Sequence, residues 1–196
     1  MAKLNSSLKN MVLSLSLISF VASALLAAGF TLTKDPIVKA QIKQQQDAIQ
    51  EVLPVKDATI GEKVEIKLDG KPDAFIIYPA LIDGEFAGAA IQTYSYEGYG
   101  GKIEVMVGMD KEGKISNYTI LSASETPGLG SKSSFWFKTP KGDQDIRGKN
   151  PAKDNFKVKK DGGDFDAITA STISSRAFLS SIRSAFDAFK KYNEHK

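Results

Sequence analysis

A short stretch near the end of the chain concentrates side-chain hydroxyl groups. Residues 166–178 read DAITASTISSRAF and include five serines and threonines: Thr169, Ser171, Thr172, Ser174 and Ser175. A hydroxyl at a helix start commonly caps the helix by accepting a hydrogen bond from a free backbone amide. Capping needs only one hydroxyl, and the amides and dipole of a helix N-terminus also stabilise a phosphate group. Two hypotheses follow: Ser171 or Thr169 caps a helix, or one of the hydroxyls is esterified to phosphate.

The residue types that the chain lacks exclude several other kinds of site. It has no cysteine, and its one histidine, His195, is the next-to-last residue. A thiol nucleophile, a disulfide and a thiolate metal site are therefore excluded, and a histidine at a chain end is a poor base or metal ligand. Beyond the first 32 residues, 24 basic residues are balanced by 23 acidic ones. We therefore expect no catalytic residue, no metal site and no nucleic-acid partner.

Two glycine-rich segments precede the hydroxyl stretch. Residues 96–105 read YEGYGGKIEV, and residues 124–137 read SETPGLGSKSSFWF. Glycine permits left-handed backbone angles and close approach, as at Gly130, and Pro127-Gly128 is typical of a tight turn. Neither segment contains a phosphate-binding loop motif or a dinucleotide fingerprint, so nucleoside triphosphate chemistry is not supported. From composition alone, both segments are ordinary turns.

The chain begins with a candidate membrane anchor. Residues 11–32 form a run of 22 residues without a charge, and as a helix they would extend roughly 33 Å, enough to cross a bilayer. Lys3 and Lys9 precede the run with no acidic residue between them. The positive-inside rule therefore predicts a single-pass protein of the inner membrane, with residues 1–10 cytoplasmic and residues 33 onward on the periplasmic side. A signal peptide cleaved near Ala24 is the alternative, but the apolar run continues past that point.

The remaining sequence predicts an α+β fold, an antiparallel sheet with packed helices behind one N-terminal transmembrane helix. Residues 34–53 have helical spacing, begin with Asp35-Pro36 and stop before Pro54, so we expect a helical linker over 33–54 and a domain over 55–196. Ile103, Val105 and Val107 alternate as in a strand. The expected strands are 63–68, 74–81, 86–96, 102–109 and 115–123, with a hairpin turn at 110–114, a short strand at 155–160 and a helix over 172–192.

Three segments together resemble one known family. GYGGKIEVMVGMDKEGKI, SETPGLG and DAITASTISS, in this order behind one anchor, resemble the FMN-binding domain of the G subunit of the Rnf electron-transport complex. The C subunit of the sodium-translocating NADH:quinone oxidoreductase is a close relative and the nearest alternative. In that family the inner threonine of the motif Ser/Thr-Gly-Ala-Thr-x-Ser/Thr carries FMN through a phosphoester, and Thr172 stands at that position. Ala170 and Ser171 replace the Gly and the Ala, and Ser171 adds a rival acceptor.

The resemblance implies a site and partners. It implies covalent FMN, attached by a separate flavin transferase that uses FAD and Mg²⁺, and an electron carrier that works with other membrane subunits of an Rnf-type complex in the lipid bilayer. Such a complex couples ferredoxin:NAD⁺ electron flow to Na⁺ or H⁺ movement. The residues that it implies for FMN binding are Thr172, Glu125, Thr126, Gly128, Leu129, Thr169, Ser171, Ser174 and Tyr99.

Three further residues of the same segments have two interpretations each. Trp136, like Tyr99, could stack on the flavin ring, or it could belong to the core. Lys102 could screen the phosphate, or it could be an ordinary surface lysine. Asp166 could order the turn before the helix or help the transferase recognise the motif. A different class of protein also stays open, namely an exported binding or scaffold domain without redox activity, in which the hydroxyls only cap the helix.

Overall fold

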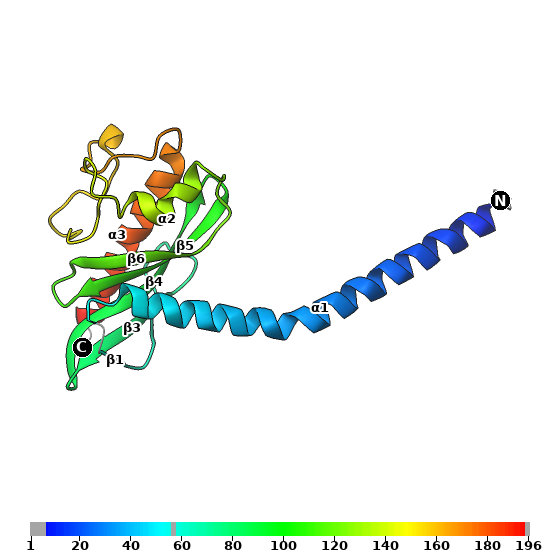
Figure 1. The fold of residues 1–196 in the computed structure, drawn as a ribbon, viewed down its shortest axis with the longest axis horizontal. Helices are drawn as coiled ribbons and strands as arrows, with labels where there is room; N and C mark the ends of the chain where they lie inside the picture. Colours follow the sequence, from blue (N-terminus) through cyan, green and yellow to red (C-terminus); the bar gives the residue numbers. More distant parts are fainter. Residues whose placement is uncertain (1–6, 56–57, 195–196) are drawn as a thin grey trace. The chain divides into compact units, whose positions relative to one another are not determined.

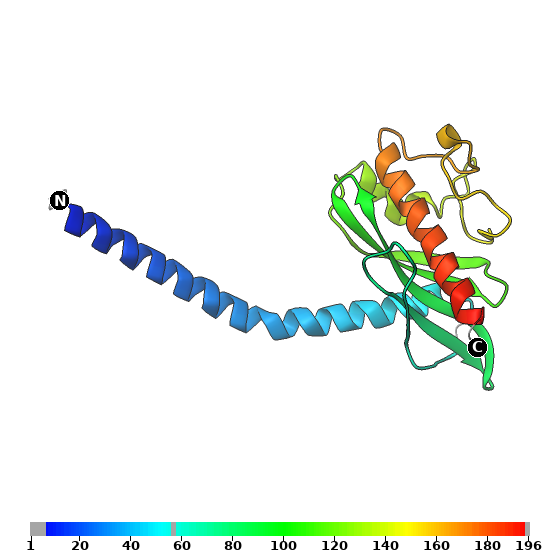
Figure 2. The same cartoon turned by 180° about the vertical axis from the view of Figure 1, so that it is seen from behind.

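The computed structural model describes residues 7–55 and 58–194, so Lys3 and His195 lie outside the described residues. The chain divides into two compact units, residues 1–44 and 45–196. The described residues of the first unit are helical from Leu8 onward, and the second unit contains a sheet of antiparallel strands with helices packed on it (Figures 1 and 2). The predicted α+β class, with one long apolar helix at the N-terminus, is confirmed.

Helix α1 runs from Leu8 to Val52 without interruption. Among the described residues it is the one helix long and apolar enough to cross a membrane. The prediction of a separate helix that starts at Asp35-Pro36 is wrong, because Pro36 lies inside α1. A proline removes one backbone hydrogen bond, but the strong helix formers on both sides of it, such as Ala, Leu, Lys and Gln, favour continuation. The helix ends before Pro54, as predicted.

The sheet has the order β1-β3-β4-β5-β6, and β2 also pairs with β3. Every strand pair is antiparallel, as the sequence predicts. The hairpin turn expected at 110–114 is present, since the Asp110 carboxylate accepts hydrogen bonds from the amides of Glu112 and Lys114. The strands are β1 (Thr59–Ile60), β2 (Val64–Ile66), β3 (Phe75–Ile82), β4 (Glu85–Gly98), β5 (Gly101–Asp110) and β6 (Ile115–Ala123).

The strand expected at 155–160 is absent. This segment contains an isolated bridge between Val158 and Phe165 and a 3₁₀ turn η2 (Lys159–Asp161). Phe156 and Val158 are both buried, and this alternation resembles that of a strand. The backbone, however, bonds to its own return segment rather than to a sheet, because Lys159 donates to the Phe165 carbonyl and Phe165 to the Lys157 carbonyl. Gly162, with φ of +75°, permits this tight return.

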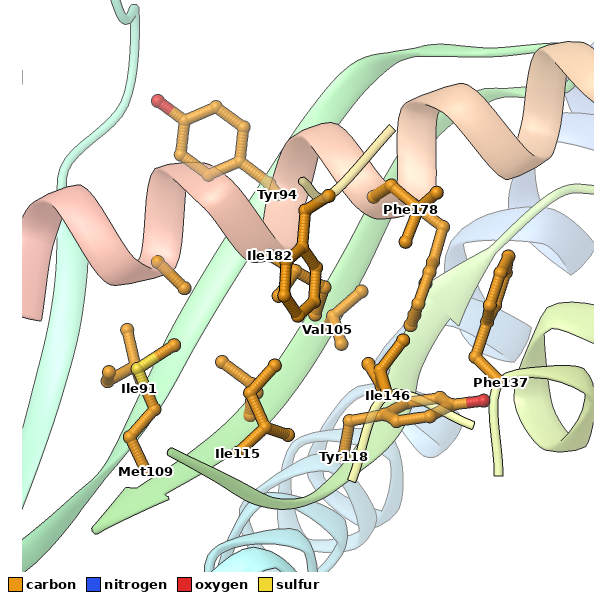
Figure 3. Packing of buried hydrophobic residues seen from close by; sticks show 14 of the residues in the cluster. Ile91, Tyr94, Val105, Met109, Ile115, Tyr118, Phe137, Ile146, Phe178 and Ile182 are labelled. Carbon is orange, nitrogen blue, oxygen red and sulfur yellow. The ribbon is translucent and has the colours of Figure 1, made fainter. Parts of the chain in front are cut away.

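One face of the sheet carries helix α3 (Thr172–Glu194), which packs mainly on β4. The predicted inward face of β5 is confirmed, since Ile103, Val105 and Val107 are all buried in this core. The ring of Phe178 on α3 stacks on Phe137, with ring centroids 4.6 Å apart, and contacts Tyr118 of β6 (Figure 3). These rings hold the first two turns of α3 against β6 and the short helix α2 (Ser133–Trp136), which follows the 3₁₀ turn η1 (Gly130–Lys132).

The opposite face of the sheet carries the last two turns of α1. Its residues Ala48, Ile49 and Val52 are buried against Ala90 and Met106. The end of the helix is also capped by β6, because Ser116 donates its hydroxyl to the Val52 carbonyl (2.5 Å) and Asn117 its amide to the Glu51 carbonyl (3.2 Å). The sheet is therefore covered on both faces.

We predict that Gly108→Ala weakens this helix–sheet contact. A methyl group at Gly108 would lie 1.7 Å from the Val52 carbonyl oxygen, so the helix end must move, and overpacking of this kind costs about 1–3 kcal/mol. Thermal or denaturant unfolding should show the loss. Gly61→Ala is the matched control, because its methyl group would make only ordinary contacts of 3.5 Å and longer. Equal stability of the two variants would contradict the proposed close approach.

Candidate functional site

The candidate site is organised around one buried carboxylate, Glu125, which is 8% exposed. Its Oε1 accepts a hydrogen bond from the Gly100 amide in the β4–β5 turn (3.2 Å), and its Oε2 accepts one from the Ser174 hydroxyl on α3 (2.6 Å). The carboxylate therefore joins both glycine-rich segments to the hydroxyl stretch. Bonds to a charged acceptor are roughly twice as strong as neutral ones, so Glu125 fixes the relative position of the three segments.

The glycines around Glu125 are required by space. A methyl group at Gly98 would lie 2.7 Å from Glu125 Oε1, and one at Gly130 would lie 2.2 Å from Oε2. Gly130 does not have a positive φ, so its backbone freedom is not what the site uses. Gly128 does have one (+74°), in a turn closed by the hydrogen bond from the Leu129 amide to the Thr126 carbonyl. The predicted Pro-Gly turn is thus present.

Three of the five hydroxyls are already committed to hydrogen bonds. Ser171 donates to Ser174 Oγ (3.0 Å), and Ser174 donates to Glu125. Ser175 donates to the Ser171 carbonyl and accepts a hydrogen bond from the Ile168 amide, both at 2.9 Å. All three serines are buried. Their hydroxyls therefore hold the turn and the first turn of α3 together.

The hydroxyls of Thr169 and Thr172 differ from those of the serines. Neither has a hydrogen-bond partner among the described residues. Thr169 is exposed, whereas Thr172 is half-buried at the first position of α3. The capping hypothesis is not supported for either side chain it named, since Ser171 bonds another hydroxyl rather than a backbone amide. In the described part of the chain the amides of Thr172 and Ile173 have no acceptor, as is usual at a helix start.

A pocket of about 530 Å³ opens beside Thr172. It lies between the β4–β5 turn, the loop that follows Glu125, and the start of α3. Exposed apolar side chains border it: Tyr99 is 72%, Leu129 38% and Ile173 50% exposed. The lining residues are Tyr99, Glu125, Thr126, Leu129, Ala170, Ser171, Thr172, Ile173 and Ser174.

Most of the residues predicted for cofactor binding thus come together, although they are far apart in the sequence. Gly128 and Thr169 are not among the lining residues, whereas Ala170 and Ile173 are. The resemblance did not name the latter two residues for FMN binding. Their position beside Thr172 at a helix start was the signal that could have identified them.

Trp136, Lys102 and Asp166, the other candidates, lie outside the pocket lining. Trp136 packs against the core and donates its ring N–H to the Asp166 carbonyl (3.0 Å). Lys102 is paired with Glu104 (2.6 Å) and Asp73 (3.2 Å). Both therefore have structural roles in this arrangement.

Asp166 orders the loop before the hydroxyl stretch. Its carboxylate accepts a hydrogen bond from the Asp143 amide (2.9 Å) and pairs with Lys159 (2.9 Å). The Lys159 ammonium and the Asp143 amide hold the pKa of Asp166 below its usual range. Of its two interpretations, these contacts support the ordering of the turn.

The backbone at Ala170 is strained. Its φ is +60°, in the left-handed region that costs a residue with a side chain about 1–2 kcal/mol. This is the position at which the family motif has glycine, so alanine keeps the turn at a conformational cost.

We predict that Ala170→Gly raises the free energy of unfolding by about 0.5 kcal/mol. Glycine relieves the backbone strain of the folded state, and its greater freedom in the unfolded chain offsets part of that gain. Asp83→Gly is the comparison, because Asp83 also has positive φ (+50°) but aspartate tolerates it better. Chemical denaturation should show a gain for Ala170→Gly and little change for Asp83→Gly. Destabilisation by Ala170→Gly would contradict the strain.

Comparison with known proteins agrees with this geometry. Residues 98–187 match the family model described as an FMN-binding domain, which spans the β4–β5 turn, the Glu125 loop and most of α3. The chain is 32% identical over 199 residues to the G subunit of the ion-translocating oxidoreductase complex of Aliivibrio fischeri (strain ATCC 700601 / ES114), covering 96% of this chain and 93% of that protein. The protein of the same name in Vibrio atlanticus (strain LGP32) is 33% identical over 201 residues, with the same coverage. The chain therefore belongs to the family of G subunits of ion-translocating oxidoreductase complexes, the Rnf family that its three motifs resemble.

Proposed function

We propose that this protein is a membrane-anchored electron carrier whose FMN is esterified through its phosphate to Thr172. One observation carries the proposal. Of the five hydroxyls in the stretch, Thr172 alone both lines the pocket and lacks a hydrogen-bond partner among the described residues. An acceptor hydroxyl must be free and reachable, and Thr172 meets both conditions.

The pocket fits FMN in size and chemistry. Its volume of about 530 Å³ lies in the range typical of small-molecule sites. Tyr99, Leu129 and Ile173 offer apolar contact to a flat ring system, and Tyr99 can stack on it. The free amides at the start of α3 suit the phosphate of an ester on Thr172. Thr126 and Glu125 add polar groups to the lining.

The attachment needs a second enzyme. The Thr172 oxygen attacks the FMN phosphorus of FAD, the phosphoanhydride bond to AMP breaks, AMP leaves, and the hydroxyl proton passes to a base. In the proposal a separate flavin transferase supplies the Mg²⁺ and the base. In this chemistry the chain presents the acceptor, and its buried serines hold the turn.

Bound FMN accepts and donates electrons, while the protein sets its position and environment. In the proposal, the carrier works with the other membrane subunits of an Rnf-type complex, in which ferredoxin:NAD⁺ electron flow drives Na⁺ or H⁺ across the membrane. The names of the relatives, which are subunits of an ion-translocating oxidoreductase complex, support this assignment.

The proposed topology follows from charge and hydropathy. Residues 1–10 lie in the cytoplasm, residues 11–32 cross the inner membrane once, and residues 33–54 link this anchor to an FMN-binding domain over 55–196 on the periplasmic side. The end of α1 packs on the sheet of that domain, so its last two turns form part of the domain's support.

The proposal is tested by flavin that survives denaturation. The full chain is co-expressed with a flavin transferase, and flavin fluorescence is read on a denaturing gel for the wild type, Thr172→Ala and Ser171→Ala. We expect fluorescence from the wild type and Ser171→Ala, and none from Thr172→Ala, because the ester requires the Thr172 oxygen.

Circular dichroism provides the control that Thr172→Ala still folds. A Thr172→Ala band as fluorescent as the wild type, with the flavin mapped to the same residue in both proteins, would contradict attachment at Thr172. A dark wild type, produced beside a transferase that modifies another flavoprotein, would contradict covalent attachment altogether.

A further inference from the structure

The hydroxyl stretch poses a problem of selectivity. Ser171 directly precedes Thr172 and lines the same pocket, and a serine hydroxyl is chemically as able to form the phosphoester as a threonine hydroxyl. We propose that Glu125, acting through Ser174, holds the Ser171 hydroxyl and thereby directs FMN to Thr172. This inference rests on the proposed function and adds the feature that selects the acceptor.

The hydrogen bonds that restrain Ser171 run in one direction toward the carboxylate. Ser171 gives its hydroxyl proton to Ser174 Oγ (3.0 Å), and Ser174 gives its own to Glu125 Oε2 (2.6 Å). Each hydroxyl has only one proton to donate. The charged acceptor therefore orients Ser174, and Ser174 in turn orients Ser171.

The carboxylate itself has little freedom to move. Its other oxygen accepts a hydrogen bond from the Gly100 amide. The carboxylate oxygens also occupy the space that side chains at Gly98 and Gly130 would need. A Gly130 methyl group would also come within 2.6 Å of Ser174 Oγ. These close neighbours and the burial of Ser174 keep its hydroxyl directed at the Glu125 carboxylate, where its oxygen accepts from Ser171.

Burial also restrains the Ser171 hydroxyl. Ser171 is 9% exposed and its hydroxyl points toward the buried Ser174, which is fully enclosed. To attack a phosphorus atom, Ser171 would have to break its hydrogen bond and rotate outward. Thr172 has no such hydrogen bond to break among the described residues. Glu125 and Ser174 are thus positioning residues, since they act on the acceptor choice through Ser171.

The test asks where FMN attaches when Thr172 is removed. The full chain is co-expressed with a flavin transferase as Thr172→Ala, as Thr172→Ala with Ser174→Ala, and as Thr172→Ala with Ser181→Ala. Ser181 is a matched control, because it is another buried serine of α3, and within the described residues its hydroxyl bonds the Phe178 carbonyl alone. Intact mass counts the adducts, and peptide fragmentation locates them.

We expect no adduct on Thr172→Ala or on Thr172→Ala with Ser181→Ala. We expect FMN on Ser171 in Thr172→Ala with Ser174→Ala. Relative to Thr172→Ala alone, loss of the hydrogen bond to Ser174 should raise the fraction of chains modified at Ser171 about tenfold or more. Ser174→Ala alone, with Thr172 present, reports whether the transferase recognises the altered motif, and the double variant is interpreted only where this single variant carries FMN.

Two results would overturn the inference while leaving the proposed function intact. One is FMN on Ser171 in Thr172→Ala alone, and the other is a folded Ser174→Ala double variant without an adduct although Ser174→Ala alone is modified. If the Ser174 variants do not fold or are not recognised, Glu125→Ala in the Thr172→Ala background decides, because alanine removes the acceptor of the Ser174 hydroxyl. FMN on Ser171 supports the inference, and its absence overturns it. An unmodified wild type would instead overturn the proposed function and this inference together.

Discussion

The site depends on a single carboxylate that receives hydrogen bonds from two distant parts of the chain. Glu125 joins the Gly100 amide to the Ser174 hydroxyl, across separations of 25 and 49 residues. A buried carboxylate without such partners would be costly, so the bonds that satisfy it also define the geometry. One glycine of each loop, Gly98 and Gly130, follows from this arrangement, because a side chain there would displace the carboxylate. The pocket beside Thr172 exists where these three segments meet.

The fold supplies the rigidity that this junction needs. Phe178 packs between Tyr118 and Phe137 and fixes the first turns of α3, so Ser174 arrives at Glu125 in a defined position. On the other sheet face, the end of α1 is held by Ala90 and Met106 and by the side chains of β6. The two contacts share the strands β4, β5 and β6. The same sheet thus carries the site on one side and the support for the helix on the other.

The sequence was sufficient for the fold class and for most strands, because period-two alternation and turn residues are local signals. Composition left the two glycine-rich loops as ordinary turns, and the family resemblance linked them to the hydroxyl stretch. The structure brings these three segments together around Glu125. The sequence failed where local patterns have two outcomes: Phe156 and Val158 alternate as in a strand but bond to their own loop, and Pro36 lies inside a helix rather than at its start. Nor could it reveal that Gly130 is needed for space, or that Ser171 bonds Ser174, since both depend on which distant segments meet.

The claim that Thr172 carries the flavin is tested most directly by fragmenting one peptide. Trypsin cuts after Lys160 and Arg176 and releases residues 161–176, DGGDFDAITASTISSR, which contain all five hydroxyls. For protein matured with a flavin transferase, the masses of the N-terminal fragments should be unshifted through Ser171. From Thr172 onward they should gain the mass of FMN less one water. A shift that begins at Thr169 or Ser171, or a peptide without any shift, would contradict the account.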